Sequence, residues 1–274
     1  NIDTIAITYG PGLAPCLWTG LNFAKDLAKS WGVPLVPVDH MEGHLLVGLL
    51  EQTNKMSKPF PAIALVVSGG HTQLVLVKDI GNYQIIGETR DDAAGECFDK
   101  TARILGLEYP GGPQIAAAAA KFSISNSQFS IKLPRPMMHT KDYDFSFSGL
   151  KTAVLYNYQA RPKKVRESKA YVQAMAAEIQ QAIIDVLLHK TLRAAKEYGA
   201  KSIILGGGVA ANIELRVAIK KECAKLNLTH FIPPPNLATD NGLMIALAGY
   251  FNFQAGKAIK NWDKLEANPN LRLA

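Results

Sequence analysis

The sequence predicts an α/β protein, and three observations lead to this prediction. Short apolar runs of strand length alternate with longer segments that have helical periodicity. Glycine turns directly follow two of the apolar runs, at residues 68–70 and 206–208. The 274 residues are 48% hydrophobic and 19% charged, which excludes a disordered or collagen-like chain and leaves room for one or two domains.

The first part of the chain alternates strands and helices. An apolar strand opens it over residues 2–8, and a helical pattern runs over 13–31 until Gly32 ends it. The next expected elements are a strand over 33–38, a helix over about 40–51, a polar loop over 52–58, and strands over 62–67, 71–77 and 83–86. Short turns separate the last three strands, so we expect an antiparallel meander.

The rest of the chain begins helical and later returns to strands. Helices are expected over 93–105 and 115–122, with the breaking segment 109–113 between them and an irregular stretch over 123–143 after them. The later expected elements are a helical region over 149–198 interrupted at 161–169, a strand over 202–205, a helix from about Asn212, a strand near 229–232 and a helix from Asp240 to about Phe253.

The two glycine turns are candidate phosphate-binding loops. Backbone N–H groups that no Cβ obstructs can donate to phosphate oxygens. Two such turns in separate halves of the chain suit a nucleotide held between two related lobes. Either turn equally suits a simple hairpin or a strand-to-helix connection, so both interpretations stay open.

His40 and His44 form a candidate metal site, because residues four apart on a helix share one face. Asp240 is the best candidate for a third ligand, since a carboxylate with two imidazoles suits a borderline divalent cation. The alternatives are two ordinary helix histidines and an aspartate that only caps a helix. Glu42 lies two residues from each histidine and therefore points to the opposite side, which disfavours a zinc peptidase.

Four acidic residues surround the expected helix start near residue 93: Asp91, Asp92, Glu96 and Asp99. Such clusters are commonly solvated and favourable with the helix dipole. Asp99 lies about one helical turn after Glu96 and ahead of the 109–113 segment, from where it could reach the ribose hydroxyls of a nucleotide.

The formal net charge of +7 favours an anionic partner such as RNA or a nucleotide. Residues 161–169 carry five basic residues and one acidic residue. This segment is either a solvated approach to a helix or a contact for a phosphate backbone.

Three scattered cysteines disfavour a disulfide framework and suit a reducing cytosol. No apolar stretch approaches the roughly 18 residues of a membrane span, so we expect a cytoplasmic protein with no membrane partner.

Seven motifs in one order resemble those of the universal tRNA threonylcarbamoyladenosine synthase family, the TsaD proteins once labelled O-sialoglycoprotein endopeptidases. They are GPGL at Gly10, VDHMEGH at Val38, VSGGHTQL at Val67, DDAAGECFDKTARILGLEYPGGP at Asp91, FSFSGLKTA at Phe145, GGGVAAN at Gly206 and ATDNG at Ala238. The match runs through most of the chain, and seven motifs together are very specific.

The resemblance implies a two-lobe, actin-like or sugar-kinase-like fold of the ribonuclease H-like class, with a nucleotide cleft between the lobes. Residues 1–90 would form the remainder of the N-terminal lobe, whose first strands we expect to be missing from this sequence. Residues 91–274 would form the C-terminal lobe, with a helical insert, a second α/β half and a last helix that returns to the N-terminal lobe.

The resemblance also implies transfer of a threonylcarbamoyl group from threonylcarbamoyl-AMP to N6 of adenine 37 in tRNAs that read codons beginning with A. Three residues match the metal ligands of the family: His40, His44 and Asp240. Eight match its substrate contacts: Val66, Val67, Ser68, Gly69, Gly70, Asp99, Gly112 and Asn212. The implied metal is a single divalent ion, with iron(II) favoured and zinc as the alternative.

The implied partners are the tRNA anticodon loop, a paralogous dimer subunit, a small P-loop ATPase and the enzyme that supplies threonylcarbamoyl-AMP. Three other functions compete with the transferase. They are a metallopeptidase, a noncatalytic nucleotide-binding scaffold and a sugar kinase of the same fold. A scaffold subunit should lack the metal histidines, and no motif in the chain resembles one for sugar recognition.

Overall fold

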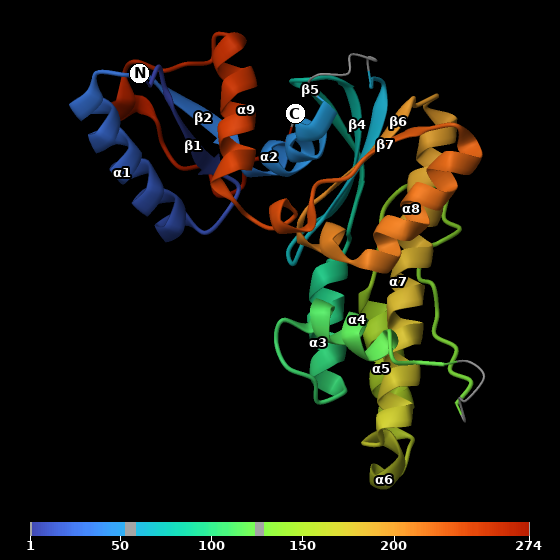
Figure 1. Cartoon of the computed structure of the whole chain (residues 1–274). Coiled ribbons are helices and arrows are strands. Elements are labelled where there is room, and N and C mark those ends of the chain that lie inside the picture. The colour runs from blue at the N-terminus through green and yellow to red at the C-terminus, as the bar shows by residue number, and fades with distance from the viewer. Residues whose placement is uncertain (1, 53–58, 124–128, 274) are drawn as a thin grey trace.

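The computed structural model describes residues 2–52, 59–123 and 129–273 (Figure 1). The strands are β1 Ile5–Gly10, β2 Leu35–Asp39, β3 Ala62–Val67, β4 Thr72–Asp79, β5 Asn82–Glu88, β6 Ser202–Gly206 and β7 Thr229–Phe231. The α-helices are α1 Ala14–Trp31, α2 His40–Leu46, α3 Ala94–Ile104, α4 Gly111–Ala119, α5 Ser148–Gln159, α6 Lys163–Arg166, α7 Lys169–Glu197, α8 Ile213–Leu226 and α9 Gly242–Gln254. Short 3₁₀ helices are η1 Val47–Gln52, η3 Gly208–Ala211, η4 Pro235–Leu237 and η5 Trp262–Lys264.

The described strands form two sheets. Strands β1 and β2 pair in parallel, and α1 and α9 pack beside them (Figure 1). The larger sheet has the order β5-β4-β3-β6-β7, in which β3, β4 and β5 form an antiparallel meander while β6 lies parallel to both β3 and β7. The predicted meander is therefore confirmed, and the pairing of β3 with β6 brings the two glycine turns to the same edge of the sheet.

Strand β3 lies at the centre of the core, and all six of its residues are buried. One face, with Ile63 and Leu65, packs in the cluster that includes α3 and α7. The other face, with Ala64 and Val66, packs against α2, η1 and α9. Burial on both faces explains why residues 62–67 are uniformly apolar and do not alternate.

A helical arm made of α3, α4, α5 and α7 extends away from the larger sheet, with α6 at its far tip (Figure 1). Helix α7 runs for 29 residues, and Ser168 caps its first turn by accepting a hydrogen bond from Tyr171 N. Asp91 holds the start of α5, because its carboxylate accepts hydrogen bonds from Phe147 N and from the Ser148 hydroxyl. The acidic residue is thus a structural cap in the arm.

Several predicted boundaries shift in the structure. The helix expected over 40–51 divides into α2 and the tighter η1. Helix α4 begins at Gly111, ahead of the expected residue 115, because Pro113 is tolerated in a first turn and Asp99 accepts the hydrogen bond of Gly111 N. Parts of two expected loops, residues 53–58 and 124–128, lie outside the described residues.

The expected lobe boundary at residue 90 stays a prediction. Strands β3, β4 and β5 precede that residue, yet they share one hydrogen-bonded sheet with β6 and β7, which follow it. No helix in the described part of the chain has both the length and the apolarity to cross a membrane.

Candidate metal and nucleotide site

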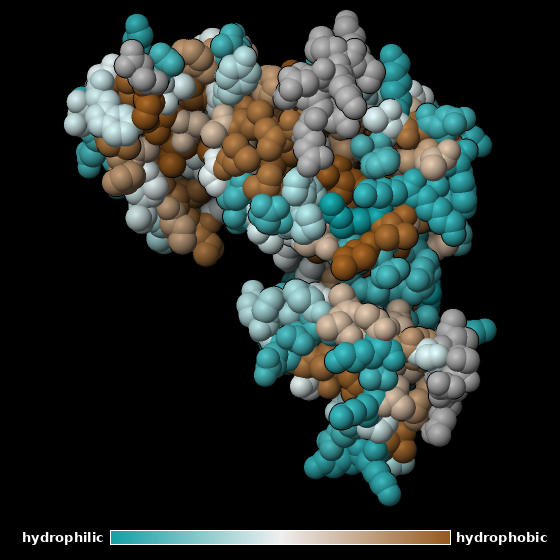
Figure 2. All heavy atoms as spheres, in the orientation of Figure 1, coloured by the Kyte–Doolittle hydropathy of each residue, from teal (hydrophilic) through white to brown (hydrophobic). Residues whose placement is uncertain are grey.

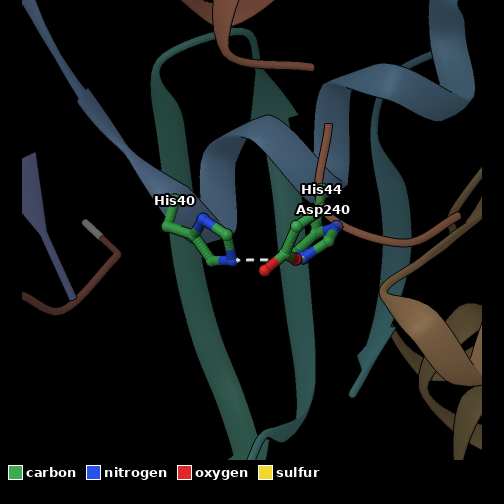
Figure 3. Close-up of side chains that lie close together, drawn as sticks. All are labelled: His40, His44 and Asp240. Carbon is green, nitrogen blue, oxygen red and sulfur yellow. Dashed lines mark ion pairs between the residues drawn. The ribbon is translucent and has the colours of Figure 1, made fainter. Parts of the chain in front are cut away.

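Helix α2 presents two imidazoles on one face. Strand β2 ends at Asp39, whose carboxylate accepts a hydrogen bond from Met41 N at 2.7 Å and so caps the helix. His40 and His44 then lie one turn apart, and both project toward Asp240, which comes from the segment ahead of α9 (Figure 3). Residues some 200 positions apart in the chain meet here.

The ligand atoms of this trio have the spacing of a metal site. Asp240 Oδ1 lies 3.3 Å from His40 Nε2 and 3.0 Å from His44 Nε2, and the three ligand atoms all fall within 4.8 Å of one another. Ligand bonds of about 2.1 Å place neighbouring ligand atoms of a four- or six-coordinate cation about 3.0–3.4 Å apart. Both distances to Asp240 fall in this range, and three ligands would leave further coordination positions open.

Asp240 is available as a ligand because its neighbour caps α9. Asn241 Oδ1 accepts a hydrogen bond from Met244 N, and its amide group donates to the carbonyl oxygens of Leu237 and Thr239. The alternative that Asp240 only caps the last helix is therefore wrong. Hydrogen bonds from His40 and His44 lower the pKa of Asp240 well below its usual range, so this carboxylate is anionic at neutral pH.

The two sides of the trio differ in exposure. The His44 side chain is 2% exposed, whereas that of Asp240 is 76% exposed. His44 Nδ1 is buried and has no hydrogen-bond partner among the described residues. His44 Nε2, which faces Asp240 at 3.0 Å, is the nitrogen that a cation in this position could use.

Glu42 lies on the opposite face of α2, as its spacing predicts. It is 4% exposed, and it accepts hydrogen bonds from the Tyr83 hydroxyl at 2.9 Å and from Asn252 Nδ2 at 2.8 Å. Both carboxylate oxygens are thus engaged in the interior, where they tie α2 to β5 and α9. A zinc peptidase needs this carboxylate beside the metal, so the geometry opposes that function.

Close contacts at two glycines bring the end of β6, where the second turn begins, against α2 and against the end of β3. A Cβ on Gly206 would lie 2.3 Å from the His44 carbonyl oxygen, and one on Gly207 would lie 2.3 Å from that of Val67. Gly207 also has a φ of +85°, which an L side chain rarely adopts. Glycine at these positions lets the end of β6 touch both the histidine helix and the end of β3.

The first turn keeps open space beside its glycines. The Ser68 hydroxyl accepts a hydrogen bond from His71 N, and the Ser68 carbonyl accepts one from Gly95 N at the start of α3. No heavy atom lies within 4 Å of an added Cβ at Gly69 or Gly70. The turn is therefore anchored at its serine and accessible along its glycines, as a phosphate-binding loop requires.

The other three predicted substrate contacts lie in the middle of α3, in the first turn of α4 and at the start of α8. Asp99 accepts a hydrogen bond from Gly111 N at 2.7 Å, and the Cβ position of the adjacent Gly112 is open. Asn212 caps α8 and donates from Nδ2 to Gln180 Oε1 at 2.8 Å. Both polar side chains thus hold the fold, and whether they also touch substrate stays a prediction.

The remaining members of the acidic cluster have structural partners. Lys100 Nζ lies 2.7 Å from an oxygen of Asp92 and 2.9 Å from one of Glu96. This part of the cluster is an ion-pair network on α3, as its position at a helix start suggests.

His71 and Gln73 were not singled out by sequence reasoning, and the structure adds them to the candidate site. With Met41 and Glu88 they line an open cavity of about 280 Å³, to whose wall the 269–273 segment also contributes. Burial, together with the nearby His40 and His44, lowers the pKa of His71, and Gln73 Oε1 is buried without a described hydrogen-bond partner. The position of His71 directly after a glycine turn is the feature of the sequence that could have indicated its place in the site.

Comparisons with known proteins identify relatives over the whole chain. A family model described as tRNA N6-adenosine threonylcarbamoyltransferase matches residues 1–247. Curated relatives with the same description are 47% identical in Thermosipho africanus and 46% identical in Bacillus subtilis. Each alignment covers 100% of this chain, and it covers 79% of the first relative and 75% of the second.

Solved structures with a similar fold are more distant in sequence. HypF from T. kodakarensis has a TM-score of 0.65 at 14% identity, over 96% of this chain and 42% of that one. Full-length HypF in a phosphate- and nucleotide-bound form has a TM-score of 0.59 at 12% identity, over 93% of this chain and 39% of that one. These likenesses concern the fold alone, and they confirm the predicted α/β, actin-like fold class.

Proposed function

The chain belongs to the tRNA N6-adenosine threonylcarbamoyltransferase family, and from this premise we propose that it moves a threonylcarbamoyl group from threonylcarbamoyl-AMP to N6 of adenine 37 in tRNAs that read codons beginning with A. The observation that carries the proposal is the meeting of His40, His44 and Asp240 beside two glycine turns at the ends of the neighbouring strands β3 and β6. A metal-ligand group next to two phosphate-binding loops is what an adenylate-using transferase needs.

The reaction is an acyl transfer with one bond made and one broken. The exocyclic N6 attacks the carbamoyl carbon, the bond from that carbon to the phosphate oxygen breaks, AMP leaves, and N6 loses a proton. An aromatic amine is a weak nucleophile, so the carbonyl must be polarised and the leaving phosphate must be stabilised. A divalent cation, when bound, supplies Lewis-acid stabilisation for this charge.

The chain's own residues supply the remaining functions. His40, His44 and Asp240 would hold one divalent ion, with iron(II) favoured over zinc. Backbone N–H groups of Gly69 and Gly70 would donate to the adenylate phosphate, and no Cβ obstructs the approach at these two glycines. Ser68 would hold the turn in place, because its own N–H donates to the His71 carbonyl at 2.8 Å.

The other carried-over contacts complete the proposed adenylate site. Val66 and Val67 end the buried strand that leads into the turn, so they fix its position under the nucleotide. Asp99, Gly112 and Asn212 would contact the nucleoside from the arm side, where Asp99 has one carboxylate oxygen beyond the one that Gly111 uses.

The target adenine lies in a single-stranded loop, from which a base can be turned outward at low cost. We extend the proposal to the anticodon loop of tRNA as substrate, and to a paralogous dimer subunit, a small P-loop ATPase and a threonylcarbamoyl-AMP synthase as partners, all in the cytoplasm. Leu13, Trp18 and Phe23 at α1 are exposed, which supports a partner that covers this helix.

The competing functions lack such support. The peptidase reading needs Glu42 beside the metal, where it is not. A scaffold subunit needs no metal ligands, and this chain has a complete set.

Mass spectrometry of tRNA nucleosides tests the proposal. The protein, its partners and threonylcarbamoyl-AMP are incubated with unmodified tRNA, and His40→Ala is run in parallel. We expect threonylcarbamoyladenosine with the wild type and none with the variant. Absence of product from folded, metal-loaded and fully partnered wild-type protein would reject the transferase, and product at the wild-type rate from His40→Ala would reject the metal's part in it.

A further inference from the structure

The tip of the helical arm carries the densest positive charge of the chain. Residues 161–169 hold five basic side chains and one acidic side chain, a net charge of +4 out of the chain's formal +7. The segment includes α6 and lies at the far end of the arm, where hydrophilic side chains gather (Figure 2). Concentration of charge at a protruding end suits contact with a large anionic partner.

These cations are unpaired, whereas several others on or beside the arm are paired. Arg135 pairs with Glu178 and Asp185, and Lys100 pairs with Asp92 and Glu96. Within the described ranges, the five basic residues of the tip form no ion pair: Arg161, Lys163, Lys164, Arg166 and Lys169. Their charge is therefore not neutralised within the fold.

The tip is also held to the arm by contacts, so the backbone that carries its charges has a defined position. The guanidinium of Arg166 lies 4.9 Å from the centre of the Tyr158 ring. The Ser168 hydroxyl donates to the Val165 carbonyl at 2.7 Å, and the Tyr171 hydroxyl donates to Asn157 at 2.9 Å. These contacts connect α5, α6 and α7, and they distinguish the tip from a flexible basic tail.

Helix α7 connects the tip to the proposed nucleotide site. Gln180 accepts the hydrogen bond of Asn212, and Lys169 begins the helix eleven residues earlier. At 1.5 Å per residue this separation along the axis is about 16 Å. Along the axis of a B-form duplex each strand presents one phosphate about every 3.4 Å, so the distance matches an axial length of about five phosphates.

We propose that Arg161, Lys163, Lys164 and Lys169 form a phosphate-contacting surface for the RNA strand whose target base occupies the site. This inference rests on the proposed function. We expect the surface to contact phosphates and to stack no base, because the segment has no aromatic side chain. It holds the anticodon arm while the chemistry takes place elsewhere.

Salt dependence of tRNA binding tests the surface. The variant Arg161→Gln/Lys163→Gln/Lys164→Gln removes three exposed charges and keeps Arg166 on its ring. The matched control, Lys220→Gln/Lys221→Gln/Lys257→Gln, removes three exposed charges elsewhere. Dissociation constants for unmodified tRNA are measured between 50 and 200 mM salt, with the protein and its partners.

Each lost phosphate contact lowers the slope of log affinity against log salt by about 0.7–0.9. We therefore expect the slope of the tip variant to be smaller by about 2, with affinity about tenfold or more weaker at low salt, and the control slope to be unchanged. A wild-type slope in the tip variant overturns the proposal. So does loss of a protein partner in the absence of RNA, which would make the tip a protein interface.

Activity separates this inference from the proposed function. With the tip variant we expect kcat for transfer within twofold of wild type and a KM for tRNA raised about tenfold. If the wild type forms no threonylcarbamoyladenosine, the proposed function fails, and a tip-dependent salt slope would still establish an RNA surface. If kcat falls while KM and the slope stay at wild-type values, the proposed surface fails and the transferase stands.

Discussion

The two faces of helix α2 carry ionisable side chains that differ in whether hydrogen bonds inside the protein already occupy them. On one face, His40 and His44 meet Asp240, whose side chain is 76% exposed, so these groups remain available to a ligand. On the other face, both oxygens of the buried Glu42 already accept hydrogen bonds. The motif thus contains both a candidate metal site, at the two histidines, and a structural carboxylate, at the glutamate between them. The hydrogen bonds that Glu42 already accepts distinguish the structural group from the candidate ligands.

The face of α2 that carries Glu42 also explains how the histidine face keeps its geometry. Glu42 connects α2 to Asn252 of α9, the helix that begins two residues after Asp240. Gly43 lets the same two helices approach closely, since an added Cβ would lie 3.2 Å from Met244 Cγ. The ligands from the two helices therefore have fixed relative positions before any cation binds.

The largest expected effect is on the histidine face of α2. His44→Ala removes one of three ligands, so we expect transfer to fall at least about 100-fold and bound metal to become substoichiometric. Metal content is measured by mass spectrometry and transfer by nucleoside analysis. His139→Ala, at an exposed histidine on the arm, is the matched control and should retain both. Full metal content in His44→Ala would contradict the ligand assignment.

On the buried face the expected effect is on stability. Glu42→Ala leaves the Tyr83 hydroxyl and the Asn252 amide unpaired, so the free energy of unfolding should fall by about 3 kcal/mol. Glu42→Gln keeps both hydrogen bonds once Asn252 turns its amide, and should cost about 1 kcal/mol or less. Urea unfolding measures both. Loss of transfer in Glu42→Gln with unchanged stability and metal content would show that Glu42 acts chemically.

Gly206 tests the contact between β6 and α2. In Gly206→Ala the new Cβ meets the backbone oxygen of His44, so we expect a loss of about 1–3 kcal/mol in unfolding free energy and weaker metal binding. Gly69→Ala is the control, because its Cβ enters open space and should change stability by less than about 0.5 kcal/mol. Equal stability of the two variants would contradict the close packing.

Asn212 is both a structural cap and a predicted substrate contact, and its replacement by alanine should have a small effect on stability. Asn212→Ala removes the cap of α8 and should cost about 1 kcal/mol. Asn212→Ser supplies a cap again and should recover most of that loss. If adenylate binding, measured by calorimetry, stays about tenfold weaker in the serine variant, Asn212 contacts the substrate. Recovery of affinity along with stability would limit it to the cap.

Most elements could be predicted from local pattern. The uniformly apolar run 62–67, the alternating strands after it and the helix ended by Gly32 all appear where periodicity and glycine placed them. The start of α4 shifted, because Asp99 pairs with Gly111 N across a loop, which no local pattern reveals.

The candidate site divides in the same way. Helical spacing alone placed His40 and His44 on one face and Glu42 on the other. Whether Asp240 was a cap or a ligand depended on Asn241, since either residue type can cap a helix and only the folded chain shows which one does. His71 and Gln73 could not be predicted as site residues, because they line a cavity together with the distant 269–273 segment.

The sequence by itself determined the α/β class, the meander, the two glycine turns and the shared face of the histidines, because each depends on residues that are neighbours in the chain. Only the tertiary structure decided that Asp240 lies against both histidines, that Glu42 accepts hydrogen bonds from Tyr83 and Asn252, and that the second glycine turn touches α2. These outcomes depend on contacts between residues 40 to about 200 positions apart, and competition among buried polar groups for partners settles them.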